Sequence, residues 1–134
     1  MKDTIEVPLS FGEVLDKITI LEIKSERIEN AEKNSNVRLE LDALNRIWAH
    51  EIQDPSRIAD VRVQLKAVNE ELWDIEDDIR AQEAKQDFGP HFISLARSVY
   101  FTNDRRAAIK KEVNLLLGSR FVEEKSYQDY SSTH

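Results

Sequence analysis

The chain has 134 residues, of which 40% are hydrophobic and 34% are charged, and its formal net charge is −7 at pH 7. The excess of acidic residues excludes a general nucleic-acid binder, which needs Lys and Arg to displace the counterions of phosphates. The lack of cysteine excludes disulfides and thiolate metal sites.

The length and the apolar content are sufficient for one domain with a buried core. No apolar stretch approaches the roughly 18 residues of a membrane span, and the first residues lack the apolar region of a signal peptide. We therefore expect a single domain over residues 1–134 of a soluble, cytoplasmic protein that has no membrane partner.

The first element expected along the chain is a helix that starts after Ser10. Residues 1–9 alternate apolar and polar side chains, which predicts an extended lead-in or a short strand. Ser10 and Glu13 have the spacing of a capping box, so a helix should begin there and run to about Lys33. Its apolar residues lie on two opposite faces, which is typical of a sandwiched helix. One face carries Phe11, Val14, Leu15, Ile18, Leu21 and Ile28, and the other carries Ile20 and Ile23.

A second helix is expected from about Asn36 to Ile52, and a third from Ser56 to Phe88. Asp54 can cap the third helix, with Pro55 as its first residue. Apolar residues recur in this segment at alternating spacings of three and four, which is the heptad pattern of a coiled coil. About 30 helical residues span about 45 Å, so we expect an elongated bundle or a dimer. The heptad positions are Ile58, Val61, Leu65, Val68, Leu72, Ile75 and Ile79.

Gly89 and Pro90 separate the third helix from the last part of the chain. A short helix is expected from His91 to about Phe101, and a last one from Asn103 or Asp104 to a C-terminal cap at Gly118. Residues from about 128 to 134 are expected to be disordered. The predicted fold is therefore all-α: an elongated antiparallel bundle of about five helices with a long central heptad helix and a short extended lead-in.

A run of acidic residues lies on the third helix, where residues 70–78 contain six acids and no base. Glu71, Asp74 and Asp78 fall near one another beside the heptad positions, so they are candidate ligands for Mg²⁺. The alternative is that the acids form ion pairs, with Lys17 and Lys24 opposite them and Arg80 beside Glu76.

A basic segment follows, because residues 91–111 contain five Lys or Arg and one acid. Unpaired backbone N–H groups at a helix start favour an anion, and guanidinium groups match the geometry of carboxylate and phosphate. The alternative is that the segment packs on the acidic run. The candidate anion-binding residues are Arg97, Tyr100, Asn103, Arg105 and Arg106.

Three segments, residues 12–24, 72–80 and 95–104, resemble an uncharacterised family of small bacterial proteins. They read GEVLDKITILEIK, LWDIEDDIR and LARSVYFTND. The resemblance extends from Pro8 to about Tyr127, and it implies a stand-alone cytoplasmic protein without implying catalytic residues.

A looser similarity is to the all-α nucleotide pyrophosphohydrolases, which hold Mg²⁺ between helices with Glu-x-x-Glu and Glu-x-x-Asp pairs. Glu71-Leu72-Trp73-Asp74 matches the second pair. The first pair has no counterpart, because Glu22 and Glu26 are four positions apart.

Two functions remain open at this point. The first is a non-catalytic helical module that has no cofactor and that forms a homodimer or binds a helical partner protein. The alternative is an anion-binding protein or a Mg²⁺-dependent enzyme that acts on a phosphorylated small molecule or nucleotide, with the acids on the metal and Arg97, Arg105 or Arg106 on the substrate.

Overall fold

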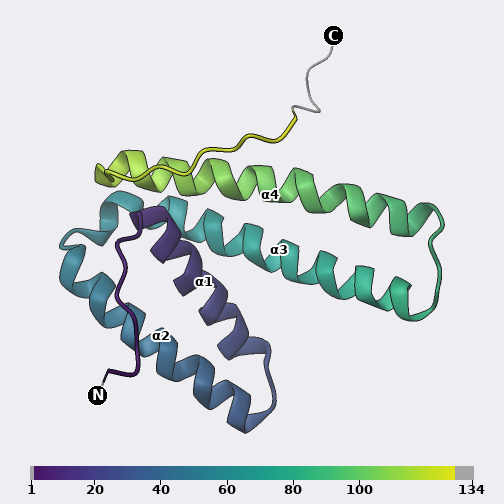
Figure 1. Cartoon of the computed structure of the whole chain (residues 1–134), viewed down its shortest axis with the longest axis horizontal. Helices are drawn as coiled ribbons and strands as arrows, with labels where there is room; N and C mark the ends of the chain where they lie inside the picture. The colour runs from purple at the N-terminus through teal and green to yellow at the C-terminus, as the bar shows by residue number, and fades with distance from the viewer. Residues whose placement is uncertain (1, 129–134) are drawn as a thin grey trace.

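The computed structural model describes residues 2–128 of the chain, and all of the regular structure in that range is helical (Figure 1). This confirms the all-α class. The elements are α1 (Phe11–Arg27), α2 (Ala31–Glu51), a single 3₁₀ turn η1 (Pro55–Ile58), α3 (Ala59–Ala84) and α4 (Pro90–Leu117).

The four helices form two antiparallel hairpins, α1–α2 and α3–α4 (Figure 1). The first hairpin crosses one end of the second, and the other end of α3 and α4 extends past it (Figure 1). α1 contacts all three other helices, so it is the central element of the fold, whereas α3 contacts α1 and α4. The expected long heptad helix at the centre of the bundle is therefore not found.

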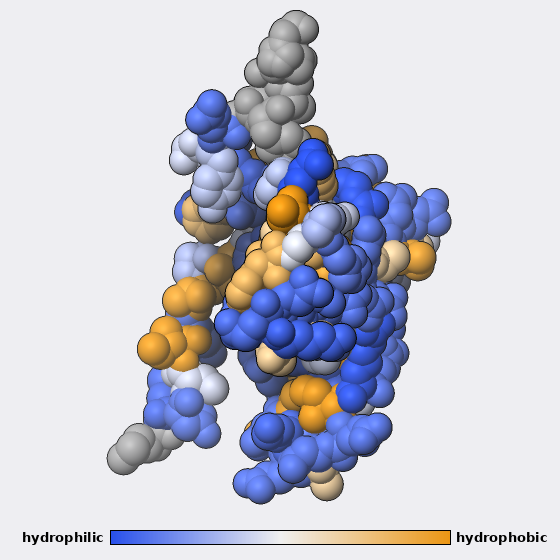
Figure 2. Space-filling model, turned by 90° about the vertical axis from the view of Figure 1, so that its right-hand side faces the viewer, coloured by the Kyte–Doolittle hydropathy of each residue, from blue (hydrophilic) through white to orange (hydrophobic). Residues whose placement is uncertain are grey.

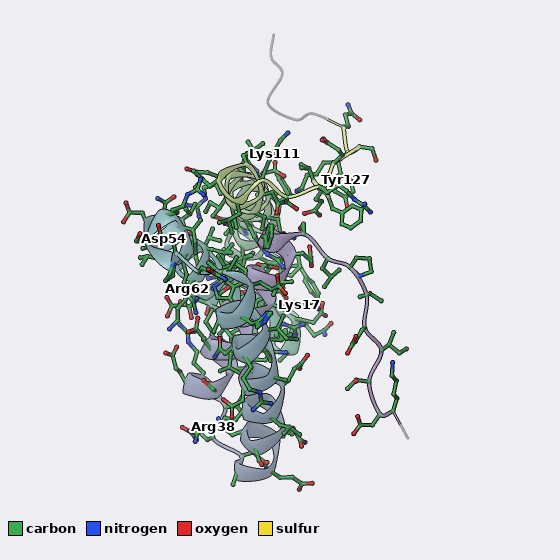
Figure 3. All side chains as sticks on the ribbon, turned by 90° about the vertical axis from the view of Figure 1, so that its left-hand side faces the viewer. Lys17, Arg38, Asp54, Arg62, Lys111 and Tyr127 are labelled. Carbon is green, nitrogen blue, oxygen red and sulfur yellow. The ribbon has the colours of Figure 1, made fainter. Side chains whose placement is uncertain are left out.

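The N-terminal cap of α1 is the one that the sequence predicts. The Ser10 side chain accepts a hydrogen bond from the Glu13 backbone N–H at 3.1 Å. The lead-in before it forms no strand within residues 2–10, and Figure 3 shows it standing away from the helices.

α1 ends at Arg27, well before the predicted end at Lys33, and α2 starts at Ala31 instead of Asn36. The reason is local capping. The Asn30 side chain accepts from the Lys33 backbone N–H at 2.9 Å and starts α2. The Asn34 amide of α2 donates to the carbonyl oxygens of Ser25 and Ile28 at 2.8 and 3.0 Å. These bonds satisfy carbonyl groups at the end of α1 that lack a partner within that helix.

The core lies where α1 meets the ends of the other helices. Ile23 is 1% exposed although it lies opposite the main apolar face of α1, which confirms that this helix is sandwiched. The buried core residues are Leu15, Ile18, Trp48, Ile52, Ile58, Val61, Leu65, Val68 and Val113.

The prediction of about five helices is wrong, because α4 is one continuous helix of 28 residues within the described range. Asn103 does not cap a new helix; its side-chain oxygen accepts from Arg106 Nη1 at 3.4 Å. Two other helix ends agree with the sequence: Asp54 and Pro55 start η1, and Gly118 closes α4 in the left-handed region with a φ of 69°.

The third helix is shorter than predicted at both ends, because η1 replaces its first turn and α3 ends at Ala84. Residues 85–89 then turn the chain, with Gln86 at a φ of 58°. Residue 128 has no regular structure, and the rest of the tail that was expected to be disordered (129–134) lies outside the described residues.

The outer part of the α3–α4 hairpin, residues 72–101, contacts α1 only at its start and is called the arm below. Burial falls along α3, from Leu65 at 0% exposed to Ile75 at 9% and then to the half-buried Ile79. Near the turn, Phe88 and Ile93 are 47% and 55% exposed. Figure 2 faces this end of the molecule and shows hydrophobic side chains lying among the hydrophilic ones.

Candidate functional site

A buried polar cluster joins α1, α3 and α4, and its central group is the carboxylate of Asp16, which is 1% exposed. Arg106 donates to Asp16 through Nε at 2.9 Å and through Nη2, so the two groups form a bidentate pair. Asn69 Nδ2 donates to Asp16 Oδ1 at 2.9 Å and to Thr19 Oγ1 at 3.0 Å. Both oxygens of the buried carboxylate are therefore hydrogen-bonded, which is the condition for keeping a charge in the interior.

Lys110 belongs to the same cluster. Its Nζ lies 2.9 Å from Glu13, 3.0 Å from Glu123 and 3.9 Å from Asp16. Burial by itself lowers the pKa of Lys110, but the hydrogen bonds to Glu13 and Glu123 and the charge of Asp16 outweigh it, so the pKa lies above its ordinary value. The hydrogen bonds to Asp16 likewise raise the pKa of Arg106. Two cations that stay protonated thus face three carboxylates.

Gly12 allows α1 to approach α4 closely enough to form this cluster. Its backbone N–H donates to Asn114 Oδ1 at 2.7 Å. A Cβ at Gly12 would lie 2.4 Å from the carbonyl oxygen of Lys110, which is backbone and cannot move aside. Only glycine fits at this contact.

A pocket of about 570 Å³ lies on one side of Arg106, between α4 and the segment 123–127. Figure 3 shows Tyr127 on that segment, beside α4. Lys125 Nζ lies 3.0 Å from Asp104 and 5.6 Å from the ring centre of Tyr127. Together with the Lys110–Glu123 ion pair, this contact holds the segment against α4.

A second pocket, of about 490 Å³, lies on the other side of Arg106 and is called the arm groove below. α1, α3 and α4 all line it. Its walls are apolar at Ile20, Ile23, Leu72 and Trp73, and polar at Asn69, Glu76, Asp77, Arg80, Asn103 and Arg106. Because Asn103 and Arg106 line both pockets, they separate the two.

The structure does not bring the three candidate metal ligands together. Glu71 pairs with Arg105 on α4, whereas Asp74 pairs with Arg27 on α1 at 2.7 Å. Asp78 is exposed and has no ion pair within 4 Å in the described part of the chain. No group of three or more His, Cys, Asp or Glu in residues 2–128 could hold a metal ion. The geometry matches the ion-pair alternative, although Arg27 takes the place expected for Lys17 and Lys24.

The five candidate anion-binding residues are divided among different surroundings. Arg105 and Arg106 form ion pairs with acids of α3 and α1. Arg97 lies over the ring of Phe101 at 5.9 Å. Tyr100 and Asn103 line the pocket beside the segment 123–127, together with Arg106. The basic segment packs in part on the acidic run, which is the second of the two alternatives.

Sequence reasoning missed the residues at the centre of the cluster, namely Glu13, Asp16, Asn69, Lys110 and Asn114. One available signal was that Asp16 is an acid within a helix that is apolar on two faces. Its partners could not be identified, because Arg106 lies 90 positions away. The arrangement holds three helices together, and its charged groups are bonded to one another.

None of the helices in residues 2–128 is long and apolar enough to cross a membrane. Comparison with curated proteins gives no match, and comparison with solved structures gives none either. Residues 5–134 match a family described as a family of unknown function (DUF6165). The match covers nearly the whole chain, as the resemblance in its three sequence segments led us to expect, and the protein therefore belongs to this family of unknown function, DUF6165.

Proposed function

We propose that the protein is a non-catalytic helical interaction module that uses its arm to bind a helix, either of another protein or of a second copy. The observation that supports this most strongly is the position of α1. It packs on α3 and α4 up to the start of the arm and leaves the rest of the arm uncovered (Figure 1).

The arm carries the side chains that a docking surface needs. Leu72 and Ile79 on α3 and Phe92 and Val99 on α4 are half-buried, and the rings of Phe88 and Phe92 pack edge to face at a centroid distance of 5.2 Å. Apolar residues that stay partly exposed between two paired helices are typical of a surface that receives a third helix.

The alternative, an anion-binding protein or a Mg²⁺-dependent enzyme, has less support. Such a site requires charges that are available to a ligand. Arg105, Arg106 and Asp74 are bonded to other side chains of the protein itself.

Photo-crosslinking at single positions tests the proposal. A photoreactive amino acid in place of Ile93, which is 55% exposed on the arm, should give discrete covalent adducts in the producing cell. The matched control is Leu39, which is 72% exposed on α2, and it should give none.

Sedimentation velocity on the purified protein completes this test, because it detects self-association through the same surface. Circular dichroism should show that both crosslinking variants are folded. A protein that stays monomeric and gives no adduct specific to Ile93 would contradict the proposed function.

A further inference from the structure

We infer that the partner that binds in the arm groove is a basic amphipathic helix of another protein and not a second copy of this chain. This inference rests on the proposed function, since it names the kind of partner that the arm binds.

α1 itself shows how a helix lies on this surface. Ile20 and Ile23 face the arm groove with Leu72 and Trp73. At the end of α1, Arg27 donates to Asp74 at 2.7 Å and lies 4.0 Å from Glu70. Its guanidinium also lies 5.8 Å from the ring centre of Trp73. α1 forms one wall of the groove, and a helix that packs beside it in the same manner places apolar residues in the groove and a basic residue against the acids of α3.

Past Arg27 the acidic edge of α3 continues without a matching helix. Glu76 and Asp77 line the arm groove, and Glu83, seven positions after Glu76, lies on the same side of α3 as Glu76. Arg80 is the one base of α3 in this stretch, and it already pairs with Glu76 at 3.0 Å. Asp77 and Glu83 have no ion pair within 4 Å inside residues 2–128, although Asp77 also attracts Arg27 at longer range. Basic residues of a partner helix would neutralise these acids as Arg27 neutralises Asp74.

A second copy of the chain does not supply such a helix. Each copy carries a net charge of −7, so two acidic surfaces would face each other. The basic residues beside buried surfaces, such as Arg62, Lys66 and Lys110, are in ion pairs already. Figure 3 shows Lys17, Arg38 and Lys111 on three different helices, at places far apart on the molecule. They do not form one basic stripe.

The experiment uses three synthetic 18-residue amphipathic helices with the same Leu positions, whose polar positions are all Lys, all Glu or all Gln. Binding is measured by calorimetry and by the fluorescence of Trp73 in a Trp48→Phe background. The Lys peptide should bind to the protein, the Glu peptide should not bind, and added salt should weaken binding of the Lys peptide.

Two double variants with the same change in net charge separate the arm from the general acidity of the surface. Asp77→Asn with Glu83→Gln should weaken binding of the Lys peptide by about tenfold. Glu40→Gln with Asp42→Asn, at exposed positions of α2, should leave the affinity within about twofold.

The outcomes distinguish this inference from the proposed function. Equal loss of affinity in both double variants, equal binding of the Glu peptide, or self-association that Val99→Asp abolishes would each overturn the inference. Of these results, the second and the third leave the arm as a docking surface. If no peptide changes the fluorescence of Trp73 and the protein stays monomeric, the proposed function fails as well.

Discussion

The carboxylate of Asp16 is the most buried charge within residues 2–128, and its hydrogen-bond partners Asn69 and Arg106 come from two different helices. Removing one member of a buried ion pair leaves the other without compensation, which costs far more than a surface pair contributes. The stability of the whole helical arrangement should therefore depend on this one side chain.

We expect Asp16→Asn to lower the free energy of unfolding by about 3–5 kcal/mol, because the half-buried Arg106 is left beside a neutral amide. Urea denaturation followed by circular dichroism measures the change. Asp42→Asn, which is exposed on α2, should change stability by less than about 0.5 kcal/mol.

A second variant keeps this prediction testable if Asp16→Asn does not fold. Replacing the pair by apolar residues, as Asp16→Leu with Arg106→Met, should recover part of the loss, since no unpaired charge remains. A loss of less than about 1 kcal/mol for Asp16→Asn alone would contradict the role assigned to the pair.

At the residue scale, the sequence predicted what depends on near neighbours. The N-terminal cap of α1 joins Ser10 to Glu13, only three positions away, and it is present. The pairing of Glu76 with Arg80, four positions apart on one helix, is present as well. The sequence does not predict the ion pairs of Asp16 with Arg106 and of Glu71 with Arg105. Helix packing decides which of these distant side chains meet.

At the scale of elements, α1 owes its position to the close contact of Gly12 with α4. We expect Gly12→Ala to lower stability by about 1–3 kcal/mol, since the new methyl group meets the Lys110 carbonyl at 2.4 Å. Thermal unfolding measures the effect. The hydrogen bond from Gly12 to Asn114 should lengthen at the same time.

Gly89→Ala is the control for this prediction, because the nearest atom to its Cβ is the Asp87 side-chain oxygen at 3.2 Å, which can move. Its cost should stay below about 1 kcal/mol. Equal costs for the two variants would show that close approach at Gly12 is not what positions α1.

The helix boundaries were predictable where the capping residue makes no other hydrogen bond that competes with capping. Asp54, Pro55 and Gly118 mark ends that the structure has. The predicted helix end near Lys33 and the predicted start at Asn103 are wrong for a common reason. Asn34 and Asn103 each lie inside a helix, where the Asn34 amide binds the end of α1 and the Asn103 amide binds Arg106 of the same helix. A side chain that can cap a helix is equally suited to these contacts, and the sequence does not distinguish the two uses.

At the scale of the whole molecule, the arm should open more readily than the rest of the protein. Local stability follows buried apolar contact, which falls along α3 from Leu65 to Ile79. We expect the amides of residues 79–95 to exchange with solvent at least about tenfold faster than those of residues 61–69, measured by hydrogen exchange with mass spectrometry.

Residues 61–69 serve as the internal control, because they belong to the same α-helix, α3, and this helix packs against α1. Uniform protection along α3 and α4 would contradict the prediction. It would also weaken the view that the arm lacks a covering helix.

The hydrogen bond between Gly12 and Asn114 joins positions 102 apart, so the packing of α1 is complete only when α4 is in place. A nascent or truncated chain without α4 keeps Leu15, Ile18 and the charge of Asp16 without their cover. Proteases and chaperones respond to exposed surfaces of this kind. Loss of α4 would therefore expose the apolar and charged groups at the centre of the fold together.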